Sequence, residues 1–182
     1  MNQTSDLTER TLSREEKYQG SFLSLHVDQV QLPNGRTSIR EVVEHVDGVA
    51  ILALDDRNKV LTVTQYRYVI GKTLLEIPAG KLEPGEDPVA GALRELKEET
   101  GAVPDTFLPM GVTLPSPGCL SERLYLFLAK GLHMESQQLD EDEFLNVERI
   151  PFNEMVHRVM DGEIEDSKTI AAVLKAKVLL NL

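Results

Sequence analysis

Apolar and polar residues alternate along the early part of the chain, and a period of two is typical of half-buried strands. Residues 21–32 show this alternation, and the sequence Leu-Pro-Asn-Gly-Arg that follows is a typical hairpin turn. Residues 37–45 continue the pattern as a second strand. Residues 1–17 are mostly polar and show no regular spacing of apolar residues, so they predict an N-terminal arm.

Further along, β-branched apolar runs dominate. Residues 49–56 and 59–67 predict a second hairpin, and residues 74–80 predict a short strand that stops at Pro78. The rest of the pattern predicts two strands separated by a Pro- and Gly-rich loop, then an acidic loop, a last strand and two helices. These segments are, in chain order, residues 106–114, 115–122, 123–132, 137–144, 147–150, 151–164 and 166–180.

One helix is predicted between the early and late strands. Asp87 is a good N-cap, Pro88 suits the first helical position, and Gly101 suits a helix end. Helical spacing gives it one apolar face directed at a core, made by Val89, Ala92, Leu93 and Leu96.

The order of these elements is mainly β, with one helix in the middle and two at the end. It predicts an α+β fold, an α/β/α sandwich around a mixed β-sheet. Residues 1–47 are expected to form an arm and an N-terminal antiparallel β-hairpin. Residues 48–182 are expected to form the main domain.

Composition narrows the class of protein. The 182 residues carry a net charge of −11 without a basic cluster, which disfavours nucleic-acid binding. No apolar run approaches a membrane span, and the N-terminus does not resemble a secretory signal. The single cysteine, Cys119, fits a reducing compartment, so a cytoplasmic location is expected. Four scattered histidines make a zinc site an unfavoured interpretation.

Three glutamates crowd the end of the predicted helix. Glu95, Glu98 and Glu99 share a face other than the apolar face directed at the core, within an arc of about 100°. Each like-charged pair costs about 0.2–0.5 kcal/mol, and the negative end of the helix dipole adds to the penalty. A solvated helix with an Arg94–Glu98 ion pair would explain part of the cluster. A bound divalent cation explains all of it, and carboxylates alone suit Mg²⁺ or Mn²⁺.

The surroundings of the glutamates favour the cation. Residues 80–102 resemble the Nudix box, the signature of the Nudix hydrolases, G-x5-E-x7-R-E-U-x-E-E-x-G-U. The matching residues are Gly80, Glu86, Arg94, Glu95, Leu96, Glu98, Glu99 and Gly101, and Ala102 departs mildly from the larger aliphatic residue usual at the last position.

The resemblance implies a metal site and a pyrophosphate hydrolysis. The implied metal ligands are the side chains of Glu95, Glu98 and Glu99 and the backbone carbonyl of Ala79. Arg94 would orient the carboxylates, and Gly80 would supply a sharp bend that turns the carbonyl inward. Glu86 would orient the loop or reach a metal.

Other segments resemble the ADP-ribose and nucleoside-diphosphate-sugar pyrophosphatases of this family. These segments are residues 20–35, 40–45, 65–67, 74–80 and the Pro-bearing loop at 116–122. The Pro-bearing loop implies that Glu122 is the catalytic base or a further metal ligand, unless it is only a solvent-facing residue of an ordinary turn. Glu98 or Glu86 is the next candidate for the base. Arg67 would contact the diphosphate unless it is only a surface arginine. Glu76 would recognise a sugar hydroxyl unless it is only an outward polar residue, and Phe22 would stack on a base unless it is a core residue.

The resemblance also implies a homodimer in which the N-terminal sheet crosses to the partner subunit. The expected substrate is a nucleotide sugar, with ADP-ribose favoured. A hydrolase of nucleoside triphosphates or dinucleoside polyphosphates is the alternative enzyme. A nucleotide-sensing Nudix domain without catalysis is the alternative of another class, although such domains typically lose the glutamates of the box.

Overall fold

The computed structural model describes residues 6–139, 141 and 143–181, which form two compact units. The first contains the chain up to Val46 together with Leu114–Glu122, and the second contains the rest. The sequence pattern did not predict that a loop so far along the chain would join the N-terminal unit.

The first unit is built on a three-stranded antiparallel sheet in the order β1-β2-β3. Its strands are β1 Arg10–Gln19, β2 Leu23–Gln31 and β3 Thr37–His45. The predicted hairpin is confirmed, and residues 10–17 of the predicted arm form most of β1. Every β1 side chain is exposed, so no apolar alternation marks the strand, and backbone hydrogen bonds to β2 define it instead. Residues 1–5 of the predicted arm lie outside the described residues.

The loop from Leu114 to Glu122 is fastened to β3. The Val43 amide donates to the Cys119 carbonyl at 2.7 Å, and the Ser121 amide donates to the Val43 carbonyl at 3.0 Å. Ser121 also accepts a hydrogen bond on Oγ from the His45 amide, at 3.0 Å. The loop thus lies along the sheet of the first unit as an irregular extra strand.

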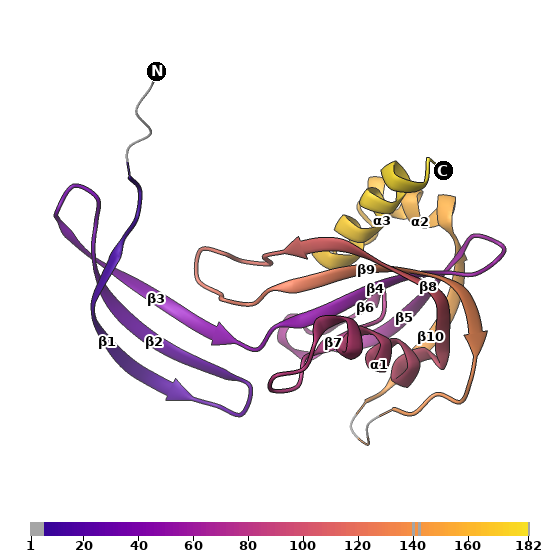
Figure 1. The fold of residues 1–182 in the computed structure, drawn as a ribbon, viewed down its shortest axis with the longest axis horizontal. Coiled ribbons are helices and arrows are strands. Elements are labelled where there is room, and N and C mark those ends of the chain that lie inside the picture. The colour runs from indigo at the N-terminus through magenta and orange to yellow at the C-terminus, as the bar shows by residue number, and fades with distance from the viewer. Residues whose placement is uncertain (1–5, 140, 142, 182) are drawn as a thin grey trace. The chain divides into compact units, whose positions relative to one another are not determined.

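The second unit contains a seven-stranded mixed sheet and three helices (Figure 1). The main path of the sheet is β10-β5-β4-β9-β8, with β6 paired to β5 and β7 paired to β4. The β4–β9 pair is parallel and the other pairs are antiparallel. The elements are β4 Gly48–Leu54, β5 Lys59–Arg67, the 3₁₀ turn η1 Tyr68–Ile70, β6 Lys72–Glu76, β7 Ala79–Lys81, α1 Pro88–Thr100, β8 Ala102–Thr113, β9 Leu124–Met134, β10 Leu145–Pro151, α2 Phe152–Met160 and α3 Ser167–Leu180.

The expected α/β/α sandwich is confirmed in this unit. Helix α1 covers one face of the sheet, and α2 and α3 cover the other (Figure 1). Strand β4 supplies both cores: Ala50, Leu52 and Leu54 pack toward α2 and α3, and Val49 and Ile51 pack toward α1. A strand covered on both faces needs no polar alternation, which explains its continuous apolar run.

The strand predicted at residues 74–80 is divided in two. Strand β6 ends at Glu76, and β7 begins at Ala79, because Pro78 has no amide hydrogen for the sheet. The Pro78 carbonyl still accepts from the Ile51 amide at 2.9 Å, so the interruption stays attached to β4. No helix of the described residues is long and apolar enough to cross a membrane.

Candidate active site

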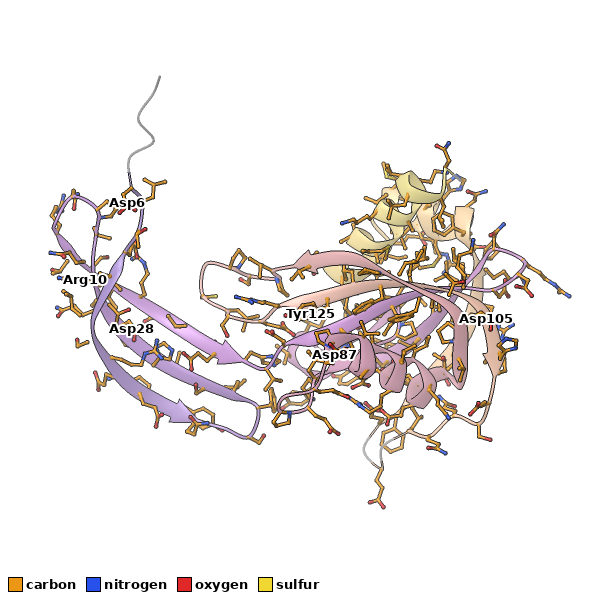
Figure 2. The ribbon with its side chains drawn as sticks, in the orientation of Figure 1. Asp6, Arg10, Asp28, Asp87, Asp105 and Tyr125 are labelled. Atoms are coloured by element: carbon orange, nitrogen blue, oxygen red, sulfur yellow. The ribbon has the colours of Figure 1, made fainter. Side chains whose placement is uncertain are left out.

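Helix α1 carries the glutamate cluster, and its limits are those that the sequence predicted. Asp87 accepts hydrogen bonds on Oδ1 from the amides of Val89 at 3.0 Å and Ala90 at 3.2 Å (Figure 2). Gly101 ends the helix at a φ of 71°, a left-handed conformation that favours glycine. These two caps set the limits of the helix, so the three glutamates fall in its last two turns.

The buried face of α1 differs from the predicted one. Val89 and Leu93 are exposed, whereas Ala92 and Leu96 are buried as expected. The buried face also includes Glu95 and Glu99, which are 9% and 2% exposed. The expectation that the glutamates lie away from the core is therefore wrong for these two, because the helix is rotated so that they point at β7.

Arg94 holds the carboxylates around it. Its Nε and Nη2 donate to the two carboxylate oxygens of Glu86, both at 2.9 Å, and its Nη1 donates to Glu95 and Glu98, again at 2.9 Å. The Arg94 hydrogen bonds lower the pKa of Glu86 to about 2. The predicted ion pairs of Arg94 are thus present, including the Arg94–Glu98 pair that would also suit an ordinary solvated helix.

Glu99 is the most deeply buried of the three glutamates. Burial raises its pKa to about 8, although the Ala79 amide donates to its Oε2 at 3.0 Å and the Lys168 charge acts in the opposite direction. Burial also raises the pKa of Glu95. Burial therefore disfavours the charged form of both carboxyl groups, although Arg94 still pairs with Glu95.

Gly80 lies inside β7, opposite Val49, and not at the sharp bend that the resemblance implied. Its importance is steric. A Cβ atom at this position would lie 1.9 Å from the carboxyl carbon of Glu95. Only glycine leaves the space that the buried carboxylate occupies.

The donor set fits a hard divalent cation. The carboxylates of Glu95 and Glu99 lie beside β7, which also carries the Ala79 carbonyl, and oxygen ligands of this kind suit Mg²⁺ or Mn²⁺. Among the described residues, no group of three or more His, Cys, Asp or Glu side chains is already gathered in a metal-binding arrangement. The Glu98 carboxylate is bound to Arg94 instead. A bound cation would offset the cost of burying the Glu95 and Glu99 carboxylates.

Arg67 and Glu76 lie together in the second unit. Arg67, the last residue of β5, donates from Nε to Oε1 of Glu76 at 2.7 Å and from Nη2 to Oε2 at 2.5 Å. The idea that Glu76 is an outward polar residue is wrong, because it is fully buried. Burial raises the pKa of Glu76, but the bonds from Arg67 and Lys168 outweigh that and hold it below its ordinary value. The sequence pattern did not predict a role for Lys168.

Phe22 and Glu122 both belong to the first unit, where His45 links them. The ring of Phe22 meets that of His45 edge to face with centroids 5.4 Å apart. Nδ1 of His45 lies 3.8 Å from Oε1 of Glu122. Phe22 is 45% exposed, so it is not the core residue considered as the alternative. His45 was not predicted, because its position at the end of β3 carries no motif.

Comparisons with known proteins define the class. The NUDIX domain model matches residues 44–173, and the model of the nucleoside diphosphate sugar hydrolase N-terminal domain matches residues 9–43. The first match spans most of the chain and includes the whole box. The chain therefore belongs to the Nudix family.

The relatives cover nearly the full length. A Bacillus methanolicus protein named methanol dehydrogenase activator is 43% identical over 91% of this chain and 90% of its own. The ADP-ribose pyrophosphatase of Bacillus subtilis (strain 168) is 41% identical over 92% of this chain and 91% of its own. A crystal structure of an ADP compounds hydrolase shares the fold at a TM-score of 0.85 and 22% identity, over 98% and 97% of the two chains.

Proposed function

We propose that this chain hydrolyses the pyrophosphate bond of ADP-ribose or a related nucleoside diphosphate sugar, with a divalent metal as cofactor. One observation carries the proposal: the intact box buries the carboxylates of Glu95 and Glu99 side by side with β7, and burial raises the pKa of both. The 41% identity to an ADP-ribose pyrophosphatase and the match to a nucleoside diphosphate sugar hydrolase N-terminal domain favour the substrate class.

The metal ligands in this proposal are the carboxylates of Glu95, Glu98 and Glu99 with the carbonyl of Ala79. Mg²⁺ or Mn²⁺ bound there would neutralise the diphosphate and lower the pKa of the attacking water. Arg94 keeps the carboxylates in place through the ion pairs described above.

The other residues act on the water and the substrate. Glu122 accepts a proton from the attacking water. The oxygen of that water forms a bond to one phosphorus, and the bond between this phosphorus and the bridging oxygen breaks. Arg67 contacts the diphosphate through Nη1, which makes no hydrogen bond within the described part of the chain. Phe22 stacks on the base, and Glu76 orients Arg67 rather than contacting a sugar hydroxyl directly.

The test is a panel of nucleotides incubated with Mg²⁺ and resolved by chromatography. ADP-ribose should give AMP and ribose 5-phosphate without free phosphate. If nucleoside triphosphates or dinucleoside polyphosphates are cleaved and ADP-ribose is not, the proposal is refuted in favour of the alternative enzyme class.

The 43% identity to a methanol dehydrogenase activator favours a second candidate function, the activation of an alcohol dehydrogenase. The chain would then raise the rate of a purified methanol dehydrogenase when added to it. An unchanged dehydrogenase rate at equimolar chain refutes this candidate and leaves the hydrolase proposal intact.

We also propose that the chain works as a homodimer that associates through the first unit. This unit exposes several large apolar side chains on its strands and on the turn between β1 and β2, namely Leu12, Tyr18, Phe22 and Ile39. Light scattering should give twice the 20.3 kDa mass of one chain. A mass of one chain at working concentration contradicts the dimer.

A further inference from the structure

Lys168 is a buried lysine that the box does not account for. It lies in the first turn of α3, and its side chain is 10% exposed. Buried lysines are rare because an ammonium group loses hydration there, so its partners must compensate. Nζ donates to Oε2 of Glu76 and, at 2.9 Å, to Oδ1 of Asp166.

These partners connect Lys168 to Arg67. Oε2 of Glu76 accepts from both cations, Lys168 and Arg67, so one carboxylate oxygen fixes the position of each. Together with Asp166, the cluster contains two positive and two negative side chains and has no net charge. The loss of the Lys168 charge would leave a net negative cluster, in which Arg67 remains as the counter-ion of Glu76 among the described residues.

The same helix end also fastens the segment that leads to the box. Thr169, which is fully buried, accepts on Oγ1 from the Ile77 amide at 2.9 Å, and two residues further on the Ala79 amide donates to Glu99. The segment from Glu76 to Ala79 is thus held by α3 on one side and by α1 on the other. A charge change at Lys168 therefore acts close to the box.

We propose that Lys168 is a positioning residue for the diphosphate site: it holds the Glu76 carboxylate that orients Arg67 and keeps this cluster electrically neutral. This inference depends on the proposed function, because it takes Arg67 to face the diphosphate of the substrate. Lys168 itself has both of its carboxylate partners in place and does not need to contact the substrate.

The experiment replaces Lys168 by Met, which keeps the length of the side chain and removes the charge. Lys168→Met should raise KM for ADP-ribose about tenfold and change kcat less than about threefold, because the anionic diphosphate meets a net negative cluster. Lys168→Arg should restore KM to within about threefold of the original chain. Lys175→Met, on the exposed side of the same helix, removes an equal charge and should leave KM unchanged.

A second readout separates this inference from the proposed function. The affinity for α,β-methylene ADP, a diphosphate analogue that resists hydrolysis, should fall about tenfold in Lys168→Met by calorimetry with Mg²⁺. If the original chain binds the analogue without hydrolysing any nucleotide sugar, the proposed function fails. The ratio of the analogue affinities of the original chain and Lys168→Met still decides the role of Lys168.

Two results would overturn the role of Lys168. One is an unchanged KM and analogue affinity in a folded Lys168→Met chain, and the other is an equal loss in Lys168→Arg, which would point to shape rather than charge. Lys168→Gln keeps a donor for Glu76 without the charge, and it serves in place of Met if the Met variant does not fold. It should show the same tenfold losses.

Discussion

Gly80→Ala tests whether the packing of the box, and not its backbone conformation, demands glycine. The added Cβ would lie 1.9 Å from the carboxyl carbon of Glu95, whereas 3.4 Å is an ordinary contact. The carboxylate must therefore move by roughly 1.5 Å, the difference between these two distances. Gly80 does not have a positive φ, so alanine can adopt its backbone conformation without strain.

The cost follows from this overlap. Overpacking a buried site costs about 1–3 kcal/mol, and the reduced entropy of the unfolded chain returns about 0.4–1 kcal/mol. The net loss of about 1–2 kcal/mol should lower Tm by roughly 2–8 °C. Because Glu95 is a proposed metal ligand, a displacement of this size should also reduce the hydrolysis rate about 10²-fold.

A double-mutant cycle measured by thermal unfolding isolates the contact. In a Glu95→Ala chain the overlapping carboxylate is absent, so Gly80→Ala should cost nothing there, or stabilise the chain slightly. An equal loss of stability in both backgrounds would refute the steric explanation and place the cause in the backbone of β7.

The other predictions concern the metal, the base and the buried ion cluster. Mg²⁺ or Mn²⁺ should raise Tm by mass action and switch on hydrolysis, and full activity in excess EDTA would contradict the metal requirement. The hydrolysis rate of Glu99→Gln should be at least ~10²-fold lower than that of the original chain. Glu122→Gln should lower kcat ~10²–10⁴-fold with little change in KM or metal affinity, and a near-normal kcat would direct attention to Glu98 or Glu86. Glu76→Gln should lower stability by about 2–3 kcal/mol at pH 7, less than for a fully buried pair because Arg67 is partly exposed. The folded-state pKa of Glu76 is lowered, so its stabilisation is complete above the ordinary value of 4.5 and is lost as the pH falls through the lowered one. The difference in Tm between the original chain and the Glu76→Gln chain should therefore become smaller in acid. A difference that stays constant from pH 7 to 3 would count against the ion cluster.

Local sequence determined most of the site's scaffold. Asp87, Pro88 and Gly101 set the limits of α1 through short-range capping, and the continuous apolar run of β4 marked a strand that the structure covers on both faces. The spacing of the box identified the glutamates and Arg94 before any contact was known. Each of these signals acts over a few residues, so the order of amino acids alone carries it.

Tertiary structure decided which side chains face inward. The rotation of α1 buries Glu95 and Glu99 and exposes Val89 and Leu93, because packing against β7 outweighs the apolar count of either face. The sequence pattern did not predict strand β1, because this strand is defined by backbone hydrogen bonds to β2 and buries none of its side chains.

The partners of the buried charges were also beyond the reach of a linear pattern. Lys168 meets Glu76 across 92 residues of sequence. The loop that ends in Glu122 joins a unit whose other residues all precede it by more than 60 positions. A lysine at the start of an amphipathic helix is ordinarily a solvated residue, and no spacing rule connects it to a carboxylate on another strand. Only the folded chain brings the two cations, Arg67 and Lys168, to the buried carboxylate of Glu76. Burial removes the water that would otherwise screen these charges, so each of them depends on the others.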